Sequence, residues 1–234
     1  MIIGTVVEGP TDRLVLQAVL DQLIPGQHRY LPLQPTPTLG ETGSGWKGVR
    51  RWCRETWQRE GVTLNAILSG ATGPALDLLV IHVDASIAIE ADLQEGDDDP
   101  VADVQQPCPP AAATAGQLRR VVAHWLRCPH FPPQVVLAIP AQDTESWTFA
   151  ALYPDDELCI RPDYECARAG TDHPGHRLTL KKYGKLLQRA DGKIKKSARS
   201  YGPVAPRIAA AWEAVCRICP QAERFTQDVR RRTP

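Results

Sequence analysis

The strongest strand signal in the chain is Leu76-Asp-Leu-Leu-Val-Ile-His-Val, which ends on Asp84. It is a nearly unbroken run of apolar residues, which is typical of a strand buried on both faces of a sheet. Similar short runs predict buried strands over residues 2–7 and 134–139, and residues 28–33 could form a further strand. The sequence therefore contains three or four strands of the kind that parallel sheets use.

Helical patterns separate these strands. Gly9-Pro10 ends the first apolar run, and Thr11 or Asp12 can cap the helix that follows it. Three further helices are expected over residues 46–60, over residues 114–127 and from about Thr144 onward. Strands and helices that alternate at these intervals predict an α/β fold, with a mainly parallel sheet covered by helices on both faces.

The pattern changes along the chain and suggests two parts. Residues 1–153 form the predicted α/β domain, and residues 154–234 form a basic extension that is mostly helical or irregular. Within the first part, residues 91–113 are acidic and then rich in Pro and Ala. That composition predicts a loop or a partly ordered insertion.

The charges are separated along the chain. The 234 residues carry 27 Lys plus Arg and 27 Asp plus Glu, which gives a net charge of zero. Residues 177–234, however, hold 15 basic and 4 acidic side chains, so they carry +11 and residues 1–176 carry −11. Clustered carboxylates suit metal ions, and clustered Lys and Arg suit phosphates.

Bulk composition excludes two classes of protein. A hydrophobic content of 43% and a charged content of 23% are incompatible with wholesale disorder. No apolar run approaches the ~18 residues that a membrane-spanning helix needs. The opening Met-Ile-Ile-Gly lacks the basic region of a secretory signal, so we expect a cytoplasmic protein.

Three carboxylates stand where predicted strands end. Glu8 follows the first strand, Asp84 ends the apolar run over residues 76–83, and Glu145 lies just beyond the last strand. The carboxyl ends of parallel strands line one edge of a sheet, where ligands bind. Singly, Glu8 can be a helix-dipole partner and Asp84 a cap. Together they would repel one another without a cation, which favours a Mg²⁺ site.

Three short motifs resemble those of TOPRIM-like domains related to OLD-family nucleases. Val7-Glu8-Gly9-Pro10-Thr11-Asp12 resembles the first motif, in which a strand ends on a glutamate followed by glycine. Val80-Ile-His-Val-Asp84-Ala85-Ser86 resembles the second, an aspartate pair spaced DxD. Pro140-Ala-Gln-Asp-Thr-Glu145-Ser-Trp147 resembles the third acidic element, which opens a helix. The resemblance covers about residues 1–153.

This resemblance implies a metal-dependent phosphodiester site. Glu8, Asp84 and Glu145 would surround Mg²⁺ or Mn²⁺, and the cation would activate the attacking oxygen and neutralise developing charge. Ser86 stands where the family has the second DxD aspartate, so it is assigned as a hydroxyl ligand and two-metal binding is left open. Glu90 could substitute if that segment is helical; otherwise it is a solvated charge.

The basic elements predict contacts with nucleic acid. Gly43-Ser-Gly-Trp-Lys47-Gly48 joins flexible amides to a lysine, so Lys47 either contacts a scissile phosphate or is a surface lysine. In the helix behind it, Arg50, Arg51 and Arg54 alternate with Trp46 and Trp57, which can bind a backbone and stack bases or belong partly to the core. The densest basic region supplies the other nucleic-acid-binding candidates, Lys181, Lys182, Lys185, Lys193, Lys195 and Lys196.

Two functions therefore remain for the sequence. The first is a Mg²⁺-dependent nuclease acting on DNA or RNA. The resemblance also implies an effector of a prokaryotic defence module, whose ATPase would be a separate subunit because this chain has no Walker motif. The second is a catalytically degenerate TOPRIM-like module that binds nucleic acid or protein. Ser86 favours the second function, whereas Glu8 and Glu145 favour the first.

Seven scattered cysteines give no disulfide framework by their number or spacing. Cys216 and Cys219 form a CxxC in an apolar, helix-like stretch and are expected to pack in the core. One set of four side chains could hold zinc in a tetrahedral site, the alternative being exposed loop residues. The members of this set are Cys159, Cys166, His173 and His176.

Overall fold

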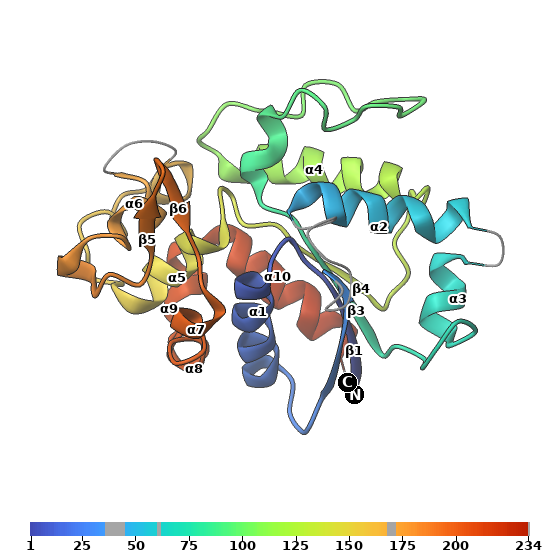
Figure 1. Cartoon of the computed structure of the whole chain (residues 1–234), viewed down its shortest axis with the longest axis horizontal. Coiled ribbons are helices and arrows are strands. Elements are labelled where there is room, and N and C mark those ends of the chain that lie inside the picture. The colour runs from blue at the N-terminus through green and yellow to red at the C-terminus, as the bar shows by residue number, and fades with distance from the viewer. Residues whose placement is uncertain (36–44, 60–61, 168–171, 234) are drawn as a thin grey trace.

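A four-stranded parallel sheet lies at the centre of the computed structural model, which describes residues 1–35, 45–59, 62–167 and 172–233 (Figure 1). Strand β1 pairs in parallel with both β2 and β3, and β3 pairs in parallel with β4, so the order is β2-β1-β3-β4. The bounds are Ile2–Val6 for β1, Arg29–Gln34 for β2, Leu78–His82 for β3 and Val135–Ala138 for β4.

Burial explains the order of the strands. All residues of β3 are buried, as expected for the longest apolar run in a central position. Strand β2 lies at an edge and is only partly buried. It contains Pro32, which has no amide hydrogen for a sheet ladder and is therefore tolerated at an edge.

Helices cover both faces of the sheet (Figure 1). Side chains of β3 alternate between two hydrophobic clusters: Leu78 and Val80 face one, and Leu79 and Ile81 face the other. Helices α1 (Pro10–Leu23), α5 (Thr144–Leu152) and α8 to α10 belong to the first cluster. Helices α2 (Trp46–Gln58), α3 (Leu64–Ser69) and α4 (Ala111–Trp125) belong to the second. The mixed α/β fold and the helix-covered parallel sheet predicted from sequence are thereby confirmed.

Residues after α5 contribute short elements and one long helix. Trp147 of α5 lies 5.4 Å from Trp212 and 6.1 Å from Phe225, measured between ring centroids. The later part of the chain therefore completes the core on the α1 side of the sheet. Its elements are η2 (Tyr164–Cys166), α6 (Pro174–Arg177), η4 (Lys181–Tyr183), β5 (Gln188–Ala190), β6 (Lys193–Lys195), α7 (Ala198–Tyr201), α8 (Ala205–Ala210), α9 (Trp212–Ile218) and α10 (Pro220–Arg232).

The acidic segment lies between η1 (Ala85–Ile89) and α4. It forms a loop that contains neither helix nor strand. Leu93, Val101 and Val104 are buried and join the second cluster. Contrary to the expectation for the cysteines, Cys108 of this segment forms a disulfide with Cys166, whose Cα lies 5.6 Å away. Sequence spacing could not reveal this bond because the two residues are 58 positions apart.

The cap predicted for α1 is wrong, whereas the packing predicted for the CxxC cysteines is confirmed. Gly9, rather than Thr11 or Asp12, is the N-cap residue of α1, and a glycine has no side chain with which to cap the helix. Cys219 is buried in the core with Cys216 packed against its edge, as predicted.

Within the described parts of the chain, no helix combines the length and the apolar character needed to cross a lipid bilayer.

Candidate metal centre

The strand order reverses direction at the carboxyl edge of the sheet. From β1 the chain moves to β2 on one side, and it later returns to β3 on the other side. Such a reversal of direction is where open α/β sheets bind ligands. Glu8 follows the end of β1 and Asp84 follows the end of β3, so the two carboxylates predicted from sequence both lie at this point of the sheet edge.

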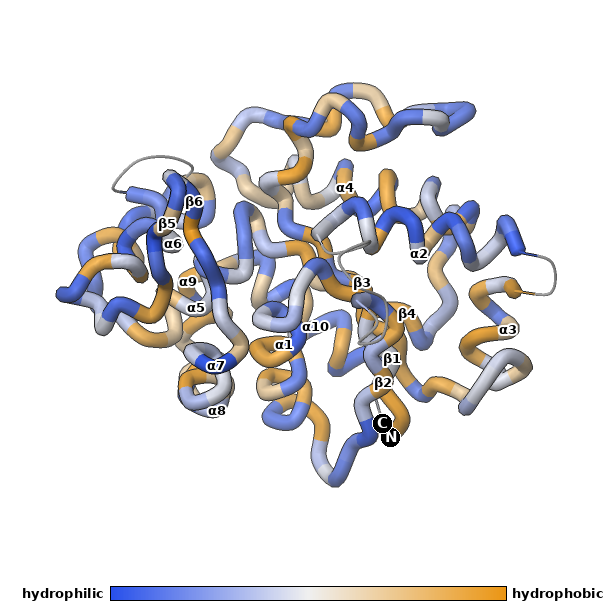
Figure 2. The backbone as a smooth tube through the Cα atoms, viewed as in Figure 1, coloured by the Kyte–Doolittle hydropathy of each residue, from blue (hydrophilic) through white to orange (hydrophobic). Residues whose placement is uncertain are grey.

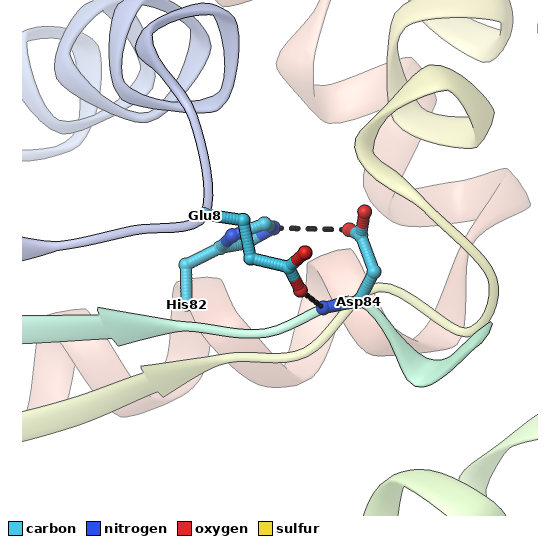
Figure 3. Close-up of side chains that lie close together, drawn as sticks. All are labelled: Glu8, His82 and Asp84. Carbon is cyan, nitrogen blue, oxygen red and sulfur yellow. Dashed lines mark hydrogen bonds and ion pairs between the residues drawn. The ribbon is translucent and has the colours of Figure 1, made fainter. Parts of the chain in front are cut away.

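Glu8 and Asp84 meet a histidine there (Figure 3). One ligand atom each from Glu8, His82 and Asp84 lies within 4.8 Å of the other two. Glu8 Oε1 accepts a hydrogen bond of 2.7 Å from the Asp84 amide, and His82 Nε2 lies 3.1 Å from Asp84 Oδ1. Among the described residues, this is the group of metal-ligating side chains with that spacing.

His82 was not a candidate from the sequence, although a signal existed. His82 and Asp84 are two residues apart on extended backbone, so their side chains leave on the same side. His82 is fully buried, and its Nε2 also lies 3.0 Å from the Thr144 hydroxyl. A protonated Nε2 can therefore donate to Asp84 and fix the direction of that carboxylate.

Glu145 lies beside this group, bound by the C-terminal part of the chain. The Tyr201 hydroxyl donates to Glu145 Oε1 at 2.7 Å, and Lys196 Nζ lies 2.6 Å from Glu145 Oε2. Lys196 Nζ also lies 3.8 Å from Asp12 Oδ1. Both oxygens of Glu145 are thus engaged by residues of the predicted extension, and the side chain of Lys196 is directed into the acidic centre.

Burial of so many carboxylates in one place perturbs their pKa values. Burial, with the Asp84 charge as a second cause, raises the pKa of Glu8 to about 8. Burial raises the pKa of Glu145 to about 7 although Lys196 opposes the rise, and burial also raises the pKa of Asp84. For His82, burial acts to lower the pKa, but the hydrogen bond and charge of Asp84 outweigh it and raise the pKa to about 9. Without a cation, the centre therefore retains protons.

The possible zinc set is not assembled. Cys166 is bonded to Cys108 and cannot be a thiolate ligand. His173 has both ring nitrogens engaged: Nε2 lies 3.2 Å from Asp143 Oδ2, and Nδ1 accepts from the Gly175 amide at 3.1 Å. Asp143 in turn caps α5 by accepting from the Ser146 amide. His173 thus fastens its loop to the start of the helix that carries Glu145.

Two residues near the second motif lie outside the carboxylate group. Ser86 is exposed in η1, and its amide donates to the carbonyl of Gln142 at 3.0 Å. Glu90 is exposed at the end of the same 3₁₀ helix. Neither belongs to the cluster formed by Glu8, His82 and Asp84.

The basic candidates on α2 are engaged by the acidic loop. Lys47 pairs with the Asp92 carboxylate, and Arg50 donates to the Asp92 carbonyl at 2.9 Å. Arg51 is exposed on the same helix. Trp46 is almost fully buried, consistent with the core alternative for that tryptophan. Gly43 and Ser44 of the predicted phosphate cradle lie outside the described residues.

The remaining lysines lie along the hairpin β5–β6 and the turn before it. Lys196, immediately after β6, is directed inward as described above. Lys195 Nζ lies 3.3 Å from Asp191 Oδ2, and Lys182 Nζ lies over the Tyr183 ring. All members of this set are exposed, Lys196 included although its ammonium group is directed inward; the others are Lys181, Lys182, Lys185, Lys193 and Lys195.

Comparisons of the chain with protein-family models, with curated proteins and with solved structures find no match. The functional assignment therefore rests on the residues and geometry described above.

Proposed function

We propose that this chain is a divalent-metal-dependent nuclease that hydrolyses phosphodiester bonds of DNA or RNA on a TOPRIM-like α/β fold. The observation that carries the proposal is the convergence of Glu8 and Asp84, with His82, at the point where the strand order reverses. Two carboxylates from strand ends, one of them aligned by a buried imidazole, suit a divalent cation.

The residues present fit a Mg²⁺ or Mn²⁺ ion. Glu8 and Asp84 would hold the metal, and His82 would donate to Asp84 and keep that carboxylate aligned. Asp12 is a further carboxylate at this edge, and its buried Oδ1 accepts no hydrogen bond within the described part of the chain. When bound, the cation supplies an activated water and neutralises charge on the phosphoryl group.

The chain's own residues supply the remaining electrostatics. Lys196 is held by Glu145, and its side chain keeps 30% of its surface exposed. An ammonium group in this position can contact a substrate phosphate and stabilise its negative charge. Glu145 is thus assigned to positioning Lys196, because both of its oxygens are already engaged.

A path for the substrate backbone is supported by the hairpin that ends at Lys196. The hairpin β5–β6 is largely hydrophilic (Figure 2), and Lys193 and Lys195 are exposed on it. Such side chains bind phosphates without regard to sequence. A nucleic-acid strand lying along the hairpin would place one of its phosphates beside Lys196.

A second candidate is a binding module that has lost catalysis. It is favoured by Ser86, which supplies a hydroxyl in place of a carboxylate and is exposed outside the cluster. In that case Lys196 would neutralise the carboxylates permanently, and nucleic acid would bind without being cleaved.

Cleavage assays distinguish the two candidates. Labelled single- and double-stranded DNA and RNA are incubated with wild-type protein in Mg²⁺, Mn²⁺ or EDTA, in parallel with Glu8→Gln and Asp84→Asn. The matched control is Glu90→Gln, an exposed carboxylate outside the cluster. The nuclease proposal predicts metal-dependent cleavage that the first two variants lose and the control retains. Salt-sensitive binding without cleavage in any metal would support the binding module instead.

A further inference from the structure

Three cations on one side of α2 are all engaged by a single acidic loop, residues 92–97. Lys47 pairs with the Asp92 carboxylate, and Arg50 donates to the carbonyls of Asp92 and Glu95. Arg54 pairs with the Asp97 carboxylate and donates to the Glu95 carbonyl. The loop therefore presents a row of anionic and carbonyl oxygens to this helix.

The three cations share one face of α2. Their spacings of three and four residues, at Lys47, Arg50 and Arg54, bring side chains to the same side of a helix. The adjacent face is apolar and buried through Trp46, Val49 and Cys53. The core thus fixes how α2 is rotated, and the cationic face is directed toward the acidic loop.

This face begins beside the metal centre. The amide of Gly45, the residue before α2, donates to the carbonyl of Glu8 at 2.8 Å. The segment between η1 and α4, which includes the acidic loop, lies on the same side of the sheet as α2 (Figure 1). A nucleic-acid strand that runs from the metal centre along α2 would therefore contact the acidic loop.

The contacts of the loop are unequal. The Lys47 and Asp92 side chains keep 65% and 37% of their surfaces exposed, whereas those of Arg54 and Asp97 keep 21% and 10%. Exposed ion pairs contribute little to stability and are screened by salt. Another polyanion can therefore displace Asp92, at the end of the loop nearest the metal centre, more easily than it can displace Asp97.

Loop residues form no helix or strand that would have to unfold for such an exchange. Residues 92–97 are turns stabilised by short-range backbone hydrogen bonds, such as Glu95 amide to Asp92 carbonyl at 3.2 Å. Leu93 is buried, and Gln94 exchanges two hydrogen bonds with the backbone of Val101, so the segment stays attached at these points.

From these contacts we infer that the cationic face of α2 is a nucleic-acid-binding surface which the acidic loop occupies until a phosphate backbone displaces it. The inference rests on the proposed function only in taking the polyanion to be nucleic acid. In this arrangement the loop competes with the substrate and reduces its affinity. Removing the loop carboxylates that pair with α2 exposes the cations and strengthens binding.

The test is equilibrium binding of fluorescein-labelled single-stranded DNA and RNA in EDTA, measured by anisotropy over a series of salt concentrations. Asp92→Asn/Asp97→Asn is compared with wild type and with the control Asp99→Asn/Asp103→Asn. The control removes the same charge from the same segment but no carboxylate that pairs with α2. Lys47→Gln/Arg50→Gln is made in the wild-type and the Asp92→Asn/Asp97→Asn backgrounds.

Asp92→Asn/Asp97→Asn should bind about tenfold more tightly than wild type and steepen the dependence of log K on log salt by about 1 to 2, because each phosphate contact on a single strand contributes about 0.7. The control should change affinity by less than about threefold. Lys47→Gln/Arg50→Gln should cancel the gain in the variant and should also weaken binding by the wild type, because nucleic acid that displaces the loop contacts the same cations.

Equal affinities of Asp92→Asn/Asp97→Asn and the control would overturn the inference, as would an absence of binding in every protein. Asp92→Asn alone, at the exposed pair, gives a second measurement with the same sign should the double variant not fold. Because EDTA prevents cleavage, the result is independent of whether the protein is a nuclease. A failure of the nuclease proposal would appear only in the metal-containing cleavage assay.

Discussion

Lys196 Nζ lies 2.6 Å from Glu145 Oε2, so the basic C-terminal part of the chain places a cation inside the acidic centre. The two residues are 51 positions apart in the printed sequence and come from opposite sides of its charge separation. The contact thus joins a cation of the basic part to a buried carboxylate of the acidic part.

Loss of the Lys196 ammonium should impair catalysis more than metal binding. Lys196→Gln is expected to lower the rate of cleavage about 100-fold, as for removal of one group that stabilises charge in a transition state. Its Mn²⁺ affinity should not fall, because the variant removes a competing cation. Single-turnover cleavage and Mn²⁺ titration measure the two effects separately. Arg199→Gln, an exposed cation nearby in sequence, is the control, and an equal loss in both variants would refute a specific role for Lys196.

The stability of the metal-free protein should fall as pH rises. The pKa values of Glu8 and Glu145 are raised from 4.5 to about 8 and about 7, and that of His82 from 6.5 to about 9. The folded state therefore binds protons more tightly than the unfolded chain, and the resulting stabilisation is present at low pH and lost as pH passes through these raised values. Urea unfolding at about pH 5, 7 and 9 measures this loss. Glu8→Gln should flatten the profile, and a stability that rises over this range would contradict the account.

Crowding at Gly9 should make that position intolerant of a methyl group. A Cβ on Gly9 would lie 3.1 Å from Asp12 Oδ2, at the start of the helix that leaves the metal centre. Gly9→Ala should lower Mn²⁺ affinity about tenfold, an effect comparable with the loss of a residue that orients a ligand. The control is Gly116→Ala in α4, where a Cβ meets nothing within 4 Å and should stabilise the helix by about 1 kcal/mol. Mn²⁺ titration and thermal unfolding of both variants decide the matter.

The disulfide between Cys108 and Cys166 should be detectable and stabilising. Thiol titration of the denatured, unreduced protein should find five of the seven cysteines free. Because the bond closes a loop across 58 positions, replacing both residues with Ser should lower the free energy of unfolding by about 3 kcal/mol. Seven free thiols in protein purified under oxidising conditions would contradict the bond.

Much of the sheet and two carboxylates of the candidate site could be predicted from sequence. Apolar runs revealed β1, β3 and β4, because burial on both faces leaves an unbroken pattern. Glu8 and Asp84 followed from their places at strand ends. His82 could also have been found, since it precedes Asp84 by two residues on the same side of the strand.

Other parts of the site depend on contacts that no local pattern encodes. Tyr201 reaches Glu145 from 56 positions away, and Lys196 looked like one member of an exposed basic run. The engagement of Lys47 by Asp92 likewise joins residues 45 positions apart. Charge runs in a sequence show how much charge is available, but only packing decides which charges face one another.

The most direct test of a metal site at Glu8 and Asp84 is a Mn²⁺ titration followed by electron paramagnetic resonance. The wild-type protein should bind a single Mn²⁺ tightly. Glu8→Gln and Asp84→Asn should each weaken binding at least about 100-fold, and His82→Asn should weaken it about 10- to 100-fold. Glu145→Gln should retain affinity because its oxygens contact Tyr201 and Lys196. If the wild type binds no Mn²⁺, or if Glu8→Gln and Asp84→Asn bind it as tightly as the wild type, the carboxyl edge of the sheet is not a metal centre.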